Sequence, residues 1–97
     1  MFAVIMYDIP SDEEGTKRRT KVHNLLLKYG YHVQNSAFEL TVDYSKLLIL
    51  THEISKIIDN EVDSVRLYKL GAKRTSENVV LIGKREYVET SDNMIEI

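Results

Sequence analysis

The sequence predicts an α+β fold, in which an antiparallel sheet is covered on one face by two helices. Three observations predict it: an apolar opening run, two amphipathic stretches at helical spacing, and a turn signal in the strand-like segment between them. With 97 residues and 43% hydrophobic content, the chain is expected to form a single domain over 1–97.

The first strand and the first helix are expected in the first third of the chain. Residues 2–7, FAVIMY, form an apolar run that Pro10 and Ser11 end. The Ser-x-x-Glu spacing at 11–14 is a capping box, which predicts a helix start near residue 12, although Gly15 leaves a start near residue 16 open. The helix is expected to stop at Gly30, and its apolar stripe is Val22, Leu25, Leu26 and Tyr29.

A short hairpin and a second helix are expected next. Residues 32–42 are strand-like, with Asn35 and Ser36 in the middle where a turn would fall. Asp43 is a candidate N-cap for a helix that ends near Asp59 and Asn60. Its predicted stripe comprises Tyr44, Leu47, Leu48, Thr51, Ile54, Ser55 and Ile58, broadened by Ile49, Leu50 and Ile57.

Two more strands are expected at 64–70 and 78–83, joined by a polar loop. The succession is the split βαβ pattern of a ferredoxin-like βαββαβ sandwich with an additional C-terminal strand. Residues 84–97 then form a C-terminal extension whose apolar side chains are expected to pack on another surface.

Composition excludes several classes of function. The chain has no cysteine, no glycine-rich nucleotide loop, and three histidines at no zinc-ligand spacing. It has no targeting segment and no apolar run of membrane-spanning length, so a cytoplasmic protein without membrane association is expected.

Basic residues gather in two stretches although the formal net charge is −2. The candidate nucleic-acid-binding residues in them are Lys17, Arg18, Lys21, Arg66, Lys73 and Arg74. From charge alone, a solvated helix face and a charged loop account for these stretches equally well.

Asp8 is the candidate metal ligand, because it ends a buried strand and offers carboxylate oxygens of the kind that Mg²⁺ prefers. An Asx-turn or cap before Pro10 is the alternative. Arg19 lies on the side of the predicted stripe and is expected to reach back toward Asp8, so that both face one space for a phosphodiester, or else form a purely structural ion pair.

Three aromatic side chains stay ambiguous between base stacking and core packing: Tyr7, Tyr31 and Phe38. The glycine-flanked signature of the RNA-recognition module, another user of this fold, does not occur.

Several motifs in order resemble one family. They are Tyr7-Asp8-Ile9, Arg19-x-Lys21-Val22, Tyr29-Gly30, the run VQNSAFE at 33–39 and the run DSVRLY at 63–68. Over about residues 2–83 the chain resembles the CRISPR-associated protein two family, which is described as endoribonucleases and as partners in spacer acquisition.

The resemblance implies a homodimer in which the two Asp8 carboxylates hold a divalent cation, Mg²⁺ or another such as Mn²⁺. It links Tyr7, Arg19 and Phe38 to nuclease activity and places Ser36 near the metal. His32 stands where relatives often carry an arginine, which makes a phosphate contact there weaker and pH-dependent. By the same analogy, the segment after Gly83 adds a strand to the partner's sheet.

The resemblance also implies partners: the CRISPR-associated protein one integrase, and a DNA duplex or single-stranded RNA. The expected function is a metal-dependent endonuclease of spacer acquisition. The alternatives are a catalytically silent DNA-binding scaffold of the integration complex and a toxin-type ribonuclease on the same fold.

Overall fold

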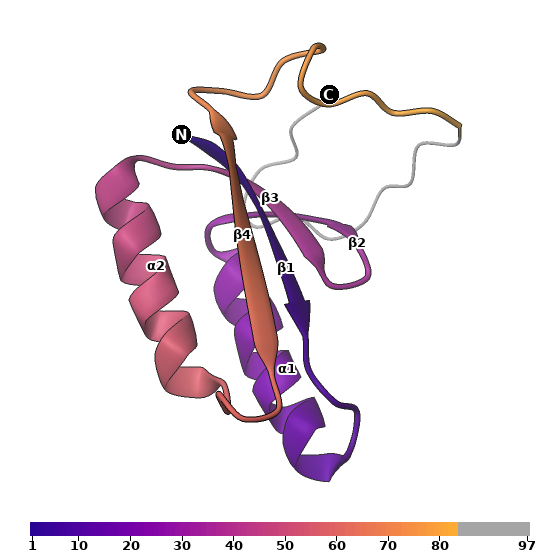
Figure 1. Cartoon of the computed structure of the whole chain (residues 1–97), viewed down its shortest axis with the longest axis vertical. Helices are drawn as coiled ribbons and strands as arrows, with labels where there is room; N and C mark the ends of the chain where they lie inside the picture. Colours follow the sequence, from indigo (N-terminus) through magenta and orange to yellow (C-terminus); the bar gives the residue numbers. More distant parts are fainter. Residues whose placement is uncertain (84–97) are drawn as a thin grey trace.

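The computed structural model describes residues 1–83 as a four-stranded antiparallel sheet with both helices on one face (Figure 1). The elements are β1 (Phe2–Asp8), α1 (Glu13–Leu27), β2 (Gly30–Gln34), β3 (Ala37–Thr41), α2 (Tyr44–Ile57) and β4 (Ser64–Gly71). The strand order is β2-β3-β1-β4. The predicted ferredoxin-like βαββαβ arrangement is confirmed, whereas the expected C-terminal extension at 84–97 lies outside the described residues.

The core lies between the sheet and the helices. Alternate residues of β1 point into it, and they meet the buried stripes of both helices. The buried core side chains include Ile5, Tyr7, Val22, Leu25, Leu26, Phe38, Leu40, Leu47, Leu50 and Ile54. Within residues 1–83, neither helix is long and apolar enough to cross a membrane.

Helix α1 begins one residue later than the capping box predicted. Its N-cap is Asp12, whose carboxylate accepts the Gly15 N–H at 2.7 Å. Gly15 lies inside the helix. A Cβ at this residue would stand only 1.9 Å from the Pro10 carbonyl oxygen, so the close packing there requires glycine. The alternative of a start near residue 16 is therefore wrong, and the glycine serves close packing.

Gly30 does not stop α1, contrary to the sequence-based expectation. The helix ends at Leu27 with Lys28 as C-cap, and Tyr29 N–H still donates to the Leu26 carbonyl at 2.9 Å. Gly30 is the first residue of β2, where a Cβ would lie 2.2 Å from the Glu39 carbonyl oxygen. This glycine permits close approach of β2 to β3.

The hairpin and the second helix formed as predicted, with one difference in the buried stripe. Asn35 adopts the left-handed conformation (φ 39°) between β2 and β3, and Asp43 caps α2 by accepting the Lys46 N–H at 2.9 Å. The buried stripe of α2 is Leu47, Leu50 and Ile54, while Tyr44 and Leu48 are each 52% exposed. Burial on one side only leaves the rest of the wide apolar face in solvent.

The strand predicted at 78–83 is absent from the structure. Side chains close a local turn there instead: Thr75 N–H donates to Asn78 Oδ1 at 2.8 Å, and Asn78 Nδ2 donates to the Lys73 carbonyl at 3.0 Å. Such local hydrogen bonds compete with strand pairing. The apolar side chains of Val80, Leu81 and Ile82 are exposed.

A buried ion pair fastens α1 to the segment between α2 and β4. Arg18 Nε and Nη2 donate to the two carboxylate oxygens of Asp63 at 2.7 and 3.0 Å, and the Asp59 N–H donates to the same carboxylate at 2.8 Å. The Asp63 side chain has no exposed surface, and the Arg18 guanidinium holds its pKa below the usual range. The guanidinium of Arg18 is therefore used to hold α1 in place within the fold.

We predict that Arg18→Leu destabilises the protein clearly more than Lys17→Leu does, because it leaves the Asp63 carboxylate, which has no exposed surface, without its cation. Lys17→Leu is the matched control: Lys17 has only an exposed partner, Glu14, at 3.5 Å, so its loss costs about 0–1 kcal/mol. Urea unfolding at pH 7 and fixed protein concentration measures both. Equal effects of the two substitutions would contradict a structural role for Arg18.

We further predict that the Arg18–Asp63 pair makes stability depend on acid pH. Because the folded pKa of Asp63 is lowered, its contribution is complete above the unfolded aspartate value of about 3.9 and is lost as pH falls through the folded value. Asp43, whose pKa the Lys46 N–H lowers, acts in the same direction, so wild type is compared with Asp63→Asn. The difference in unfolding free energy between them should shrink below about pH 4; a constant difference would contradict the prediction.

Candidate functional site

The end of β1 sends two neighbouring candidate residues to opposite faces of the sheet. Tyr7 is buried on the helix-covered face, opposite Val65 of β4, whereas Asp8 is exposed on the open face, opposite Ser64. This follows from the pleat of a strand, in which successive side chains alternate. The site residues predicted from sequence therefore fall into two groups.

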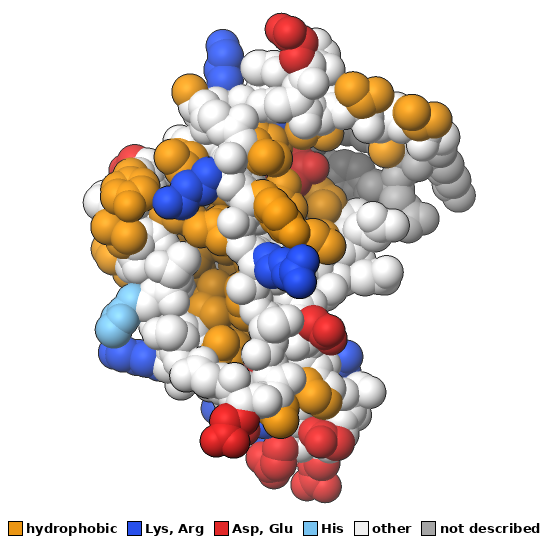
Figure 2. All heavy atoms as spheres, viewed as in Figure 1, with side chains coloured by type: hydrophobic (Ala, Val, Ile, Leu, Met, Phe, Trp, Pro, Cys, Tyr) orange, Lys and Arg blue, Asp and Glu red, His pale blue; other side chains and the backbone are white. Residues whose placement is uncertain are grey.

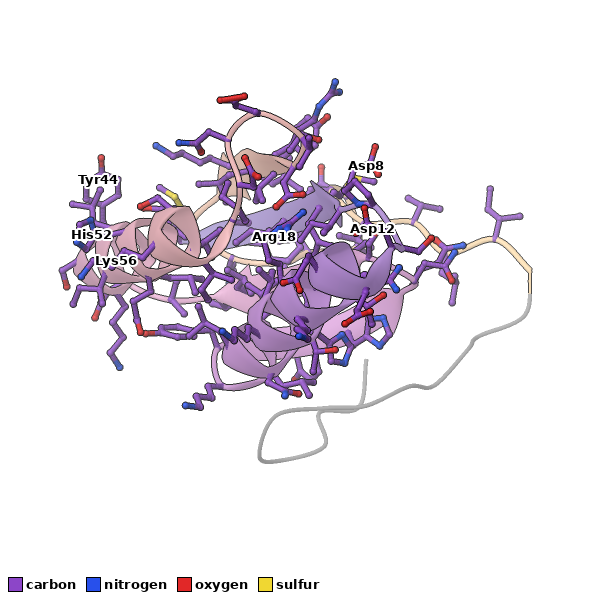
Figure 3. All side chains as sticks on the ribbon, turned by 90° about the horizontal axis from the view of Figure 1, so that it is seen from below. Asp8, Asp12, Arg18, Tyr44, His52 and Lys56 are labelled. Carbon is purple, nitrogen blue, oxygen red and sulfur yellow. The ribbon has the colours of Figure 1, made fainter. Side chains whose placement is uncertain are left out.

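Asp8 stands on a rigid support among exposed apolar side chains. Met6 of β1 shares its face, pairs with Arg66 in register, and is 44% exposed. Tyr68 and Leu70 of β4 extend this apolar strip, and Figure 2 shows it running along the sheet toward the segment after β4. Figure 3 views Asp8 from the end of the sheet where α1 begins.

Asp8 is the candidate ligand for a divalent cation in this chain. Within residues 1–83, three or more histidine, aspartate or glutamate side chains nowhere gather closely enough to hold a metal ion. Mg²⁺ is usually bound by one or two carboxylates together with waters and phosphate oxygens. The Asp8 carboxylate fits one of these places.

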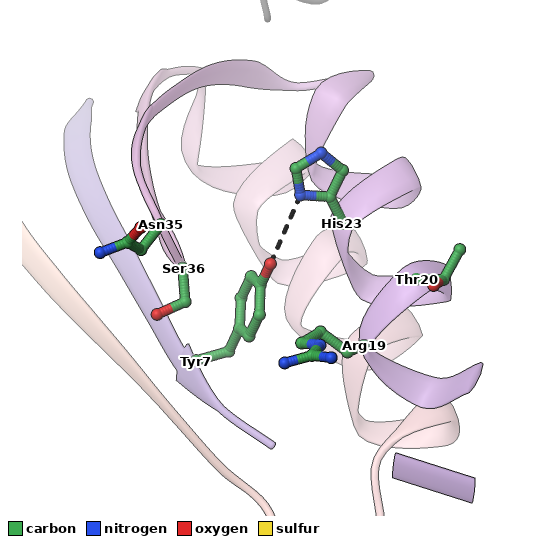
Figure 4. Close-up of a pocket in the computed structure, with 6 residues that line it drawn as sticks. All are labelled: Tyr7, Arg19, Thr20, His23, Asn35 and Ser36. Atoms are coloured by element: carbon green, nitrogen blue, oxygen red, sulfur yellow. Dashed lines mark hydrogen bonds between the residues drawn. The ribbon is translucent and has the colours of Figure 1, made fainter. Parts of the chain in front are cut away.

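Arg19 does not reach Asp8. Among the described residues no ion pair joins them, and Arg19 instead lines a hollow of about 440 Å³ on the helix-covered face. The expectation of a common space for Asp8 and Arg19 is wrong, because α1 covers the face into which Tyr7 points and Asp8 points to the other. The hollow is lined by Tyr7, Arg19, Thr20, His23, Asn35 and Ser36 (Figure 4).

The β2–β3 turn forms one wall of the hollow and is held by two contacts. Tyr7 N–H donates to the Ser36 carbonyl at 3.1 Å, and His32 Nε2 donates to the Asn35 carbonyl. Ser36 thus lies beside Tyr7. His32 supports the turn from within.

Two aromatic side chains that line the hollow, Tyr7 and His23, pack against the ring of Phe38. His32 stacks on Phe38 with centroids 5.0 Å apart, and His23 meets the same ring edge-on at 5.2 Å. Tyr7 lies 6.4 Å from Phe38, and its hydroxyl is 3.4 Å from His23 Nδ1. Phe38 has no exposed surface, so it supports these rings from within the core.

The six basic candidates divide into paired and exposed side chains. Arg18 is bound to Asp63, and Arg74 Nε lies 3.0 Å from Glu39 on the open face. The exposed four come from α1, β4 and the segment after β4: Lys17, Lys21, Arg66 and Lys73. Of these four, Lys17 lies 3.5 Å from Glu14 in an ion pair that is largely exposed, whereas Arg18 and Arg74 are held by carboxylates that are mostly buried.

Sequence reasoning missed His23 as a member of the site. Its spacing of four residues from Arg19 places both on one side of α1, which was a usable signal. The sequence gives no such signal for the Arg18–Asp63 ion pair, because the two residues lie 45 positions apart.

Comparisons with known proteins agree with this architecture. Residues 1–78 match the family described as CRISPR associated protein Cas2. The chain is 40% identical over 96 residues to the CRISPR-associated endonuclease Cas2 of Halalkalibacterium halodurans, covering 98% of this chain and 99% of that protein. It is 33% identical over 95 residues to the CRISPR-associated endoribonuclease Cas2 of Fusobacterium nucleatum, covering 98% and 87%.

A solved structure is similar as well. The crystal structure of Streptococcus pyogenes Cas2 at pH 6.5 superposes with a TM-score of 0.77 at 36% identity, covering 86% of this chain and 100% of that one.

Proposed function

This chain belongs to the CRISPR-associated Cas2 family, and on that basis we propose that it is an endonuclease of spacer acquisition that hydrolyses phosphodiester bonds in RNA or DNA. The observation that carries the proposal is the position of Asp8, an exposed carboxylate at the rigid end of a buried strand. The names of the relatives, endonuclease and endoribonuclease, support the reaction class.

We infer that the active unit is a homodimer formed over the open face of the sheet. Met6, Tyr68 and Leu70 are exposed on that face, and a contiguous apolar strip of this kind is typical of an interface. A two-fold contact brings the same residue of both chains together. Two copies of Asp8 would then supply the two carboxylates that one chain lacks.

A divalent cation, Mg²⁺ or Mn²⁺, is the proposed cofactor. When bound, it would supply a Lewis acid for the phosphodiester and for an attacking water. In this proposal, the Asp8 carboxylate of this chain would hold that cation. Tyr7, Arg19 and Phe38, which the family resemblance linked to nuclease activity, lie across β1 from Asp8, so we propose that they support the reaction by positioning substrate or strand.

A second candidate function is a catalytically silent scaffold that binds a DNA duplex together with the Cas1 integrase. The exposed charges of Lys17, Lys21, Arg66 and Lys73 favour it, because phosphate contacts position a duplex without a metal site or base readout. The two functions are compatible in one protein.

We predict that Asp8→Asn abolishes Mg²⁺-dependent cleavage while the fold persists, because the amide keeps the shape of the side chain but loses the charge that binds a cation. Cleavage of labelled RNA and DNA is measured with and without EDTA. Glu14→Gln is the control, since it removes an exposed carboxylate near the same end of the molecule. Undiminished cleavage by thoroughly purified Asp8→Asn would refute the metal site.

The same Asp8→Asn protein separates the two functions. If it still supports spacer integration with the integrase while cleavage is lost, the scaffold function stands independently of nuclease activity. Loss of integration together with cleavage would favour the enzymatic function alone.

We predict that replacing Lys17, Lys21, Arg66 and Lys73 by glutamine weakens duplex binding and flattens its salt dependence by about 0.9 units of slope for each phosphate that the protein no longer neutralises. Arg18 and Arg74 stay unchanged, because their ion pairs would confound binding with stability. Lys46→Gln with Lys56→Gln on α2 is the control. An unchanged slope, measured by fluorescence anisotropy over a salt series, would mean that the four lysine and arginine side chains are only solvated.

A further inference from the structure

Arg66 is the cation that the sheet places next to Asp8. In the antiparallel pairing of β1 with β4, Met6 lies opposite Arg66. Asp8 follows two residues later, opposite Ser64. Residues that face each other across two strands point to the same side, so Arg66 stands on the open face with Met6 and Asp8. Asp8 and Arg66 are therefore diagonal neighbours, about 7–8 Å apart, a gap that a long side chain spans.

Within residues 1–83, no carboxylate occupies the Arg66 guanidinium. Arg18 and Arg74 are each held by an acid, at 2.7 and 3.0 Å, whereas no ion pair joins Arg66 to a described residue. Its side chain hydrogen-bonds that of Tyr68, and this contact raises the pKa of Arg66. Tyr68 lies two residues along the same face of β4. The tyrosine thus orients the guanidinium and leaves most of its five N–H donors for a ligand.

The position of Arg66 at the margin of the sheet keeps it accessible. Among the described strands, β4 is at an edge of the sheet, beside β1. Arg66 is exposed there. Met6 lies one strand further in, so a second copy can cover Met6 while the long Arg66 side chain reaches past the rim to a strand of nucleic acid.

Lys69 provides the contrast on the same strand. It lies opposite Ala3 and so on the helix-covered face, where its ammonium stands 5.3 Å from the centroid of the Tyr44 ring. Strand β4 thus directs one cation to each face of the sheet. The cation on the open face is an arginine, whose planar fork of N–H donors matches the oxygens of a phosphate group.

We propose that Arg66 is a catalytic residue, which binds the non-bridging oxygens of the phosphodiester at Asp8 and is held in position by Tyr68. The proposal rests on the proposed function and deepens it, because the cation at the reacting phosphate then comes from β4 and not from Arg19 on α1. In hydrolysis, water adds to phosphorus, the bond from phosphorus to the leaving oxygen breaks, and a proton of the water ends on that oxygen. Arg66 keeps its protons and stabilises the negative charge that grows on the non-bridging oxygens.

A double-mutant cycle in EDTA measures this contact without metal and without metal-dependent cleavage. Binding of a short fluorescent single strand is followed by anisotropy at fixed salt, with wild type, Asp8→Asn, Arg66→Gln and the double variant. In the Asp8→Asn protein, Arg66→Gln should weaken binding about tenfold, as expected when a charged hydrogen-bond donor is lost. Lys69→Gln is the matched control on the other face and should leave binding unchanged.

The coupling between the two substitutions shows whether both side chains face one phosphate. Asp8→Asn should strengthen binding when Arg66 is present, because it removes a negative charge beside the bound phosphate, and should have little effect in Arg66→Gln. Additive effects of the two substitutions would overturn the proposal.

Cleavage in Mg²⁺ tests the catalytic part. Arg66→Gln should lower kcat about a hundredfold, and Arg66→Lys should restore part of it, because lysine keeps the charge without the fork. Tyr68→Phe should lower kcat more than it raises KM, since it misplaces the guanidinium without removing it. Sedimentation at one protein concentration compares oligomeric states; a change of that state in Arg66→Gln would make Arg66 an interface residue and overturn the proposal.

Failure of this proposal is distinguishable from failure of the proposed function. If Asp8→Asn abolishes cleavage and Arg66→Gln cleaves as wild type does, the metal site stands and the assignment of Arg66 is overturned. If Asp8→Asn cleaves undiminished, the proposed function fails. Coupling of Asp8 with Arg66 in EDTA would then still support a shared phosphate contact and overturn only its catalytic part.

Discussion

The alternation of side chains along β1 is the constraint on which the rest of the molecule depends. Paired on both sides by β3 and β4, the strand cannot rotate, so Tyr7 must enter the helix-covered face and Asp8 must leave on the open face. A register slip of one residue would exchange the two and would also expose Ile5. Core packing thus fixes the chemistry available on each face.

The Arg18–Asp63 ion pair determines how α1 is turned against the sheet. It fixes α1 against the segment before β4, and the helical step of 100° between neighbours then turns Arg19 away from Asp63 and toward Tyr7. Adjacent arginines in one basic run therefore have different surroundings: Arg18 neutralises a buried carboxylate, and Arg19 lines the hollow beside Tyr7. A run of like charges in a sequence does not reveal this division.

Local signals predicted most of the fold, and long-range contacts decided what they missed. The apolar run of β1, the Asn35–Ser36 turn and the Asp43 cap are readable because each depends on a few adjacent residues. The strand expected at 78–83 did not form: side-chain hydrogen bonds of Thr75 and Asn78 close a turn before it, and the apolar side chains of Val80, Leu81 and Ile82 stay exposed. The sequence identified Asp8, Tyr7 and Arg19 as candidate site residues. It could not show that the sheet separates Asp8 from the other two, because this depends on which face α1 covers.

The separation has a chemical consequence for how a strand of nucleic acid is held. Two Asp8 carboxylates brought together by the proposed dimer would repel phosphate unless a cation were bound between them. Since Asp8 does not line the hollow, a phosphate bound there is not the one at Asp8 of the same chain. Under the proposed function, Arg19 would therefore act by placing the strand, and contact with the phosphate at Asp8 would be left to groups on the open face, where Arg66 of β4 lies in register with Met6.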